Sequence, residues 1–507
     1  MPRAPRGFDR LFDERALVWA MGLASALLLV LLLAFDDIPM VDLPQHAAQI
    51  ASWVRLEQPG SIYAERFELN LRTPYVLANA LARQLAPLFG VVIALKLAVW
   101  LSIVGNMLAV RRLAQRLGHD PFIALFGLLT ACGLCFYFGF ISFMLAVTLG
   151  LFGLVAALDH ARAPTLRSGL VLAVVMSLTL VAHGVAFALT TGIIGVALLR
   201  GQGRWFVRFA PLAGPALVAL FFFLPGPISQ RIGGDYWDLR WTRLLDFPAL
   251  LASFGASDRF SFVLGLCVLG LCLFVLGVRP ARWFERPAML AGLLVAYAFF
   301  PVLFRGIALL HTRLPALLLP VLMLALSARP PQKPPLVRAG RGAILLVTAT
   351  WLAVFGLRLV RFKAESASYH ELVRDLPAGL AMRPIIYDRD SRVFPGVPAY
   401  LHYSAYYFVE KGGFQGYSFA MYPISVVRYR PSVEAGMQNA AEWRPELFDV
   451  KKEVPRYDYF LVKSETDRSA ELFAKAPEQV VLTKRSGPWW GYEKAARLSA
   501  STGPARQ

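Results

Sequence analysis

The chain has 507 residues, of which 57% are apolar, and 52 lysines and arginines against 33 aspartates and glutamates give it a formal net charge of +19. The apolar residues come in long blocks separated by short arginine-rich connectors, a distribution typical of membrane proteins. Residues 1–360 hold 31 of the basic and 16 of the acidic residues, so the excess charge flanks the apolar blocks. Because these basic residues do not alternate with aromatic residues, the composition argues against nucleic-acid binding.

Apolar blocks that can cross a membrane follow one another along the first 360 residues. A helix rises about 1.5 Å per residue and the hydrocarbon core is about 30 Å thick, so a span needs roughly 20 apolar residues. The first block is too long for a signal-peptide core and has no small-residue cleavage site after it, so we expect it to remain as an anchor. The predicted spans lie near residues 15–35, 91–110, 121–139, 141–158, 168–184, 186–200, 208–226, 261–278, 287–304, 311–327 and 341–360.

The stretch from residue 74 to 110 contains either one span or two. Two spans would place the basic run RRLAQRLG outside. If residues 74–89 instead form a helix on the outer surface, this run is cytoplasmic, as the positive-inside rule requires, and every later arginine-rich connector is cytoplasmic as well. We therefore expect about eleven spans, a cytoplasmic N-terminus and a C-terminal tail on the opposite side. In a bacterium this is a multi-pass protein of the cell inner membrane with a periplasmic tail.

The tail after the last span is long enough to fold alone. Its sequence alternates between helical and extended patterns: a helix around SYHELVRDL, strands at RPIIYD and YDYFLVK, a helix at RSAELFAKA and a hairpin over VVLTKRSGPWWGYEK. The predicted fold class is thus an α-helical polytopic membrane protein with a small extracytoplasmic α/β domain. The predicted boundaries are 1–360 for the transmembrane domain and 361–507 for the α/β domain.

Acidic residues follow the first span directly, in FDDIPMVDLPQHAAQI. Asp42 and His46 are four residues apart and share a helix face if a helix begins at Asp42. One interpretation is structural: Asp42 caps that helix, Pro44 occupies its first turn and His46 is solvated. Capping explains Asp42 but not the carboxylate pair that includes Asp37. These side chains could also hold a divalent metal, although their spacing is not diagnostic of one.

Cations and imidazoles lie near the same predicted outer membrane edge. Lysine and arginine side chains often reach the interface there for structural reasons alone. The functional interpretation is favoured because acids, imidazoles and cations from four separate segments meet one membrane face. A carboxylate base beside cations that hold a phosphate is what glycosyl transfer from a lipid phosphate requires. The basic candidates are Lys96, His183, Arg305, His311 and Arg313.

The membrane region resembles the GT-C superfamily, membrane glycosyltransferases that use polyprenyl-phosphate-linked sugars and include protein O-mannosyltransferases and lipid A aminoarabinose transferases. The resemblance rests on the acids after the first span, on the Pro-bearing helix RTPYVLANALARQLAPLFG, on ALKLAV leading into the next span, and on HTRLPALLLPVLMLAL. The chain departs from the family in one respect: the family often has a compact Asp-Glu pair, whereas this loop has DD followed by DLPQH.

The resemblance implies that an aspartate of the first outer loop acts as the catalytic base and that basic residues near the outer surface bind the donor phosphate. Carried over, Asp42 or Asp37 is the base, with His46 beside it. Lys96, Arg313, Arg305 and His311 would bind the donor phosphate, and His183 would line the same cavity. The implied function is inverting transfer from a polyprenyl-phosphate sugar to a lipid or glycan acceptor.

Two non-catalytic functions remain open from the sequence. One is a membrane component of polysaccharide or lipid assembly or transport; the other is a degenerate enzyme that acts as a binding scaffold. Transporters usually show internal repeats, and the sequence contains none that is evident.

Overall fold

The computed structural model describes residues 13–223, 236–238, 240–255, 257–277, 285–304, 307–327, 333–431, 440–476 and 478–497. The chain divides into two compact units. The membrane unit comprises Met1–Ala34, Leu71–Ala82 and Lys96–Leu357, and the second unit, which we call the loop–tail unit, comprises Phe35–Asn70, Arg83–Leu95 and Arg358–Gln507. The predicted tail domain thus forms a compact unit together with most of the first outer loop.

Apolar helices account for the predicted spans. Within the described ranges, seven are long and apolar enough to cross a membrane: Glu14–Ala34, Val91–Leu117, Pro121–Phe138, Ile141–Arg162, Trp205–Phe222, Arg259–Leu276 and Pro334–Val373. Four shorter apolar helices are Leu166–Ala182, Gly184–Leu199, Pro287–Phe299 and His311–Ala325. Each of the eleven predicted spans overlaps one of these segments, which confirms the polytopic helical fold class. The amphipathic stretch at 74–89 forms helix α4 (Val76–Phe89).

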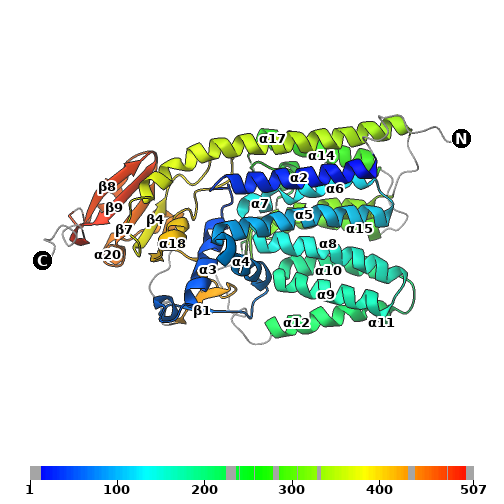
Figure 1. The fold of residues 1–507 in the computed structure, drawn as a ribbon, viewed down its shortest axis with the longest axis horizontal. Coiled ribbons are helices and arrows are strands. Elements are labelled where there is room, and N and C mark those ends of the chain that lie inside the picture. The colour runs from blue at the N-terminus through cyan, green and yellow to red at the C-terminus, as the bar shows by residue number, and fades with distance from the viewer. Residues whose placement is uncertain are drawn as a thin grey trace. The chain divides into compact units, whose positions relative to one another are not determined.

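Small residues allow the central helices of the membrane unit to approach closely. Helices α8 (Ile141–Arg162), α9 (Leu166–Ala182) and α10 (Gly184–Leu199) lie side by side (Figure 1). A Cβ atom at Gly150 of α8 would lie 2.5 Å from the Thr190 side chain of α10. Such close backbone contact, favoured by small residues, is a common basis of helix association in membranes.

The loop–tail unit contains a five-stranded mixed sheet in the order β5-β4-β7-β9-β8 (Figure 1). β4 is parallel to β5 and β7, whereas β9 is antiparallel to β7 and β8. The predicted strands RPIIYD and YDYFLVK are β4 and β7, and the predicted hairpin is β8 and β9. The bounds are β4 Ala381–Ile386, β5 Phe414–Gln415, β7 Tyr459–Lys463, β8 Val480–Ser486 and β9 Trp489–Lys494.

Short helices accompany this sheet. The stretch SYHELVRDL includes the end of α17 (Pro334–Val373), and RSAELFAKA contains α21 (Ser469–Phe473). Residues of α21, β7 and β9 form one apolar core in which Phe460, Phe473 and Tyr492 are buried. The tail also contains helix α18 (Ala405–Lys411) and helix α20 (Val450–Glu453).

The first outer loop belongs to the same unit as the tail. Its strand β1 (Phe67–Leu69) pairs antiparallel with β6 (Val427–Tyr429) of the tail. Its helix α3 (Leu43–Leu56) packs on α18, where the Arg55 guanidinium donates hydrogen bonds to the carbonyls of Phe408 and Val409 at 2.9 and 2.7 Å. Strands of three residues joined across about 360 positions have no local sequence pattern, so the sequence did not predict them.

Candidate functional site

Asp42 stands at the start of α3. The helix begins at Leu43 with Pro44 in its first turn, as expected. The Asp42 side chain, however, makes no capping hydrogen bond to the first turn. Helix capping therefore does not account for this carboxylate, whose side chain is 19% exposed.

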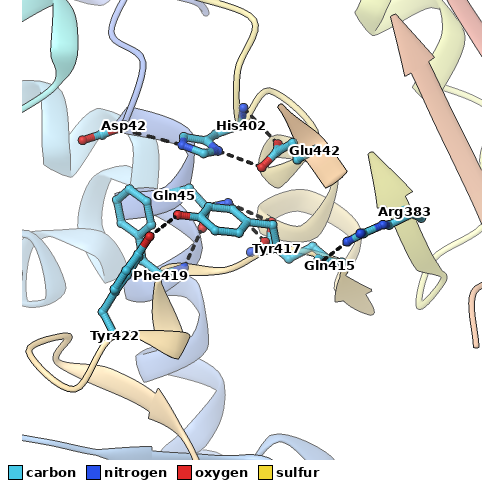
Figure 2. A network of polar contacts seen from close by, with 10 residues as sticks. Asp42, Gln45, Arg383, His402, Gln415, Tyr417, Phe419, Tyr422 and Glu442 are labelled. Carbon is cyan, nitrogen blue, oxygen red and sulfur yellow. Dashed lines mark hydrogen bonds and ion pairs between the residues drawn. The ribbon is translucent and has the colours of Figure 1, made fainter. Parts of the chain in front are cut away.

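The imidazole of His402 faces Asp42, and behind it lies Glu442 (Figure 2). His402 Nε2 is 4.0 Å from Asp42 Oδ1. On the other side of the ring, His402 Nδ1 is 2.9 Å from Glu442 Oε2, and the backbone N–H of His402 donates to Glu442 Oε1 at 3.0 Å. Glu442 is fully buried, so its carboxylate fixes both the ring and the main chain of His402.

His402 also has an unusual backbone conformation. Its φ is +68°, in the left-handed region, which a residue other than glycine adopts infrequently and at a cost in energy. The hydrogen bond from its N–H to Glu442 helps to hold this conformation, and the ring stacks on Tyr417 with centroids 5.0 Å apart. The left-handed turn aims Nε2 at Asp42 while Nδ1 remains on Glu442.

The charge of the His402 ring follows from its neighbours. Burial by itself lowers the pKa of His402, but the carboxylates of Glu442 and Asp42 outweigh burial and the net pKa is raised. The protonated ring is therefore favoured. The ring therefore presents a positive charge 4.0 Å from the Asp42 carboxylate.

Hydrogen bonds between Gln45 of α3 and the segment Tyr417–Phe419 hold α3 against the tail next to Asp42 and His402. Gln45 Oε1 accepts from the N–H of Phe419 at 3.1 Å, and Gln45 Nε2 donates to the Tyr417 carbonyl at 3.3 Å. The hydroxyls of Tyr417 and Tyr422 are 2.8 Å apart. His46, one turn after Asp42, is half-buried and meets Phe419 edge-on at 5.7 Å. These contacts link α3, which carries His46 and follows Asp42, to residues Tyr417–Phe419 beside the His402 ring.

Asp37 has a different environment from Asp42. Its side chain is 6% exposed, and Oδ2 lies 2.6 Å from Nε2 of His370. Burial raises the pKa of Asp37, but the hydrogen bond and charge of His370 outweigh burial and the net pKa is lowered. A carboxylate paired this closely is suited to joining the first loop to α17.

In the membrane unit, the structure brings together two of the predicted basic residues. His183 begins α10, and its Nδ1 accepts from the N–H groups of Val185 and Ala186. The ring of Phe143 lies 5.3 Å from the His183 ring and 5.3 Å from the guanidinium carbon of Arg313. His183 Nε2 is buried with no hydrogen-bond partner among the described residues. His183 and Arg313 thus form one buried polar cluster.

The other basic candidates are distributed along the membrane unit. Lys96 is buried near the start of α5 (Val91–Leu117). His311 opens the turn before α16 (Leu318–Ala325), with its ring 6.1 Å from that of Tyr297. Arg305 lies outside the described residues. The described part of the chain contains no group of three or more His, Cys, Asp or Glu side chains that could hold a metal ion.

Sequence reasoning missed His402, Glu442 and His370. His402 lies in the aromatic run AYLHYSAYYF, where an imidazole among buried rings is the one available signal. Glu442 and His370 carry no such signal, because each is ordinary in its local context.

Comparison with solved structures identifies the fold. ArnT from Cupriavidus metallidurans bound to undecaprenyl phosphate matches with a TM-score of 0.54 and 13% identity, over 96% of this chain and 99% of that one. The same protein in the apo state matches with a TM-score of 0.55 over the same shares. The arabinofuranosyltransferase AftD from Mycobacteria matches with a TM-score of 0.53 and 15% identity, over 95% of this chain and 40% of that one.

These similarities are structural. No protein-family model and no curated protein matches the sequence. The neighbours are GT-C glycosyltransferases, and this chain has the GT-C fold, as the resemblance implied.

Proposed function

We propose that this chain is a membrane glycosyltransferase that moves a sugar from a polyprenyl-phosphate donor to an extracytoplasmic lipid or glycan acceptor. The observation that carries the proposal is the partly exposed Asp42 carboxylate beside a histidine that is itself held by a buried glutamate. The GT-C fold supports it, and so does the undecaprenyl phosphate bound to a structural neighbour. The corresponding location is the bacterial inner membrane, with a cytoplasmic N-terminus and a periplasmic loop–tail unit.

In this reaction Asp42 is the base. It takes the proton of an acceptor hydroxyl, the hydroxyl oxygen forms a bond to the anomeric carbon, and the bond from that carbon to the phosphate oxygen breaks with its electrons leaving on the phosphate. A single displacement inverts the anomeric configuration. His402 is a positioning residue: it orients Asp42, while Glu442 fixes the ring.

Basic residues of the membrane unit would hold the donor phosphate. Arg313 is buried, with its guanidinium carbon 3.7 Å from the Phe140 ring centroid, and a fixed guanidinium can bind phosphate through two parallel hydrogen bonds. We assign the same role to Lys96, Arg305 and His311. We propose that His183, whose Nε2 has no hydrogen-bond partner among the described residues, lines the cavity that receives the donor.

The test is the pair of variants Asp42→Asn and Asp37→Asn. Each purified protein is reconstituted in proteoliposomes with undecaprenyl-phosphate-linked pentoses and hexoses and a membrane lipid and glycan extract, and free undecaprenyl phosphate is measured. Asp42→Asn should lower turnover by about 10²–10⁴-fold, the contribution of a general base. Its stability should fall by no more than about 1 kcal/mol, because the side chain is partly exposed and makes no capping hydrogen bond, while His402 keeps its closer partner Glu442.

Asp37→Asn is the matched control. It breaks a buried pair and should destabilise the protein by about 1–3 kcal/mol while folded molecules keep turning over. Full activity of Asp42→Asn would overturn the assignment of the base. Absence of turnover by the parent protein with every donor would favour a non-catalytic component of assembly or transport.

A further inference from the structure

A cavity lies in the loop–tail unit, at the ends of the parallel strands β4 and β7. Its volume is about 550 Å³. Tyr387 and Asp388 follow the last residue of β4, and Lys463 and Glu465 stand at and just after the end of β7. Ligands of α/β sheets commonly bind outside the carboxyl ends of parallel strands, and small-molecule sites have volumes of about 300–1,000 Å³. The cavity has the position and the size of a ligand site.

A buried lysine forms part of its wall. Lys463 is 5% exposed, its Nζ donates to the Asp388 carbonyl at 2.5 Å, and Nζ lies 4.4 Å from the centroid of the Tyr400 ring. An ammonium group has three N–H donors. Among the described residues this one oxygen is its hydrogen-bond acceptor, and Nζ also lies 5.8 Å from the centroid of the Trp489 ring, so a lysine in the cavity wall has further N–H donors to offer.

A buried tyrosine adds a second unsatisfied group. Tyr400 is 1% exposed, and its hydroxyl makes no hydrogen bond of good geometry among the described residues, although burial and the adjacent Glu365 carboxylate raise the pKa of this tyrosine. The nearby Glu365 carboxylate already accepts from Ser391 Oγ at 2.7 Å and from the Arg392 N–H at 2.8 Å. A buried polar atom without a partner is costly, so a ligand group that formed a hydrogen bond to this hydroxyl would be stabilised.

The charges of the lining limit the class of ligand. Four acidic and three basic side chains line the cavity, and part of this charge is neutralised internally, as between Arg392 and Glu465 at 2.7 Å. A net negative wall disfavours phosphates and other polyanions. The buried ammonium disfavours cations, and the charged walls disfavour an apolar ligand. Hydroxyl groups, which both donate and accept, suit a wall in which donors and acceptors alternate.

We propose that this cavity binds a neutral saccharide of one or two sugar residues, with its hydroxyl oxygens at Lys463 Nζ and Tyr400 Oη. The class of ligand follows from the lining alone. Its role deepens the proposed transferase function and rests on it: a saccharide bound here is the glycan part of an acceptor, held by the same unit that carries Asp42.

The experiment uses the full chain in lipid nanodiscs. Neutral mono- and disaccharides of the gluco, manno, galacto and arabino series are compared with glucuronate and inorganic phosphate by saturation-transfer NMR and by titration. At least one neutral saccharide should bind, and Tyr400→Phe should weaken its binding by about three- to ten-fold.

Tyr459→Phe is the matched control. Tyr459 is also buried with a hydroxyl that lacks a hydrogen-bond partner among the described residues, but it does not line the cavity. Because neither hydroxyl makes a hydrogen bond of good geometry among the described residues, both variants should fold nearly as the parent does, and Tyr459→Phe should bind normally. Equal binding by the two variants would overturn the proposal, as would binding of phosphate or glucuronate alone or of none of the sugars.

Binding by Asp42→Asn separates the site from the catalytic proposal. This variant should bind the saccharide as well as the parent does, even though it does not turn over. If the parent binds saccharide without any turnover, the binding site stands and the transferase proposal fails. If turnover occurs and no saccharide binds, the transferase proposal stands and the saccharide site is overturned.

Discussion

Replacing Glu442 with glutamine keeps the length and shape of the side chain but removes its charge. The native carboxylate accepts two hydrogen bonds from His402, one from the ring and one from the main chain. The glutamine oxygen can accept one of them, while the amide NH₂ faces the other donor. Because Glu442 is fully buried, water cannot take the place of the lost acceptor.

The expected loss of stability follows from this geometry. One orphaned buried donor costs about 1–3 kcal/mol, and removing one partner of a buried ion pair costs about 3–5 kcal/mol. Glu442→Gln keeps one of the two hydrogen bonds, so a loss of about 3 kcal/mol is expected, where these two ranges meet.

The assay is thermal and chemical unfolding of the detergent-solubilised chain in a double-mutant cycle with His402→Asn. Asparagine tolerates the left-handed backbone at φ +68°, so this variant removes the ring and leaves the turn. The coupling free energy between positions 402 and 442 should be about 1–3 kcal/mol. The His402→Ala variant should be less stable than His402→Asn, because alanine does not favour that conformation.

The pair also predicts a dependence of stability on pH. The pKa of His402 is raised in the folded protein, so its contribution is fully present below the unfolded pKa of about 6.5 and is lost as pH rises through the folded value. Glu442→Gln should flatten this dependence of stability on pH. In the parent, turnover measured well below the melting temperature should fall over the same alkaline range, and in Glu442→Gln that fall should be absent. A Glu442→Gln protein as stable as the parent, or a cycle with additive effects, would refute the view that Glu442 holds His402.

Two further predictions concern the loop–tail unit. Arg383 is buried in a salt bridge with Glu453 at 2.5 Å, so Arg383→Met should lower the free energy of unfolding by about 3–5 kcal/mol, measured by thermal unfolding. Arg383→Met combined with Glu453→Leu should recover part of that loss, because no unpaired charge then remains buried. An Arg383→Met protein as stable as the parent would show that the pair is not needed. Gln479→Cys places a thiol at an exposed site of the tail. If the tail is periplasmic, this thiol should react with a membrane-impermeant maleimide in intact spheroplasts. Labelling only after permeabilisation would place the tail in the cytoplasm.

The membrane helices are the part of the fold that local sequence predicts best. Whether a segment is apolar over about 20 residues is a property of that segment alone, so the spans could be read before any contact was known. The strands at RPIIYD and YDYFLVK were likewise predicted, because each contains a short stretch of apolar and aromatic residues typical of an extended segment. Strands β1, β5 and β6, of two or three residues, exist only through their pairing and have no such pattern.

For the candidate site as well, part was predicted from the sequence and part depends on tertiary structure. The sequence alone identified carboxylates directly after the first span, and the resemblance to GT-C enzymes implied that one of them is a base. Asp37 and Asp42 are alike by type and position in that loop. What distinguishes them is that Asp37 is buried against His370, whereas Asp42 remains partly exposed beside His402. Those histidines lie more than 300 residues further along the chain, so only tertiary packing decides which carboxylate has a structural partner and which faces a positioned imidazole.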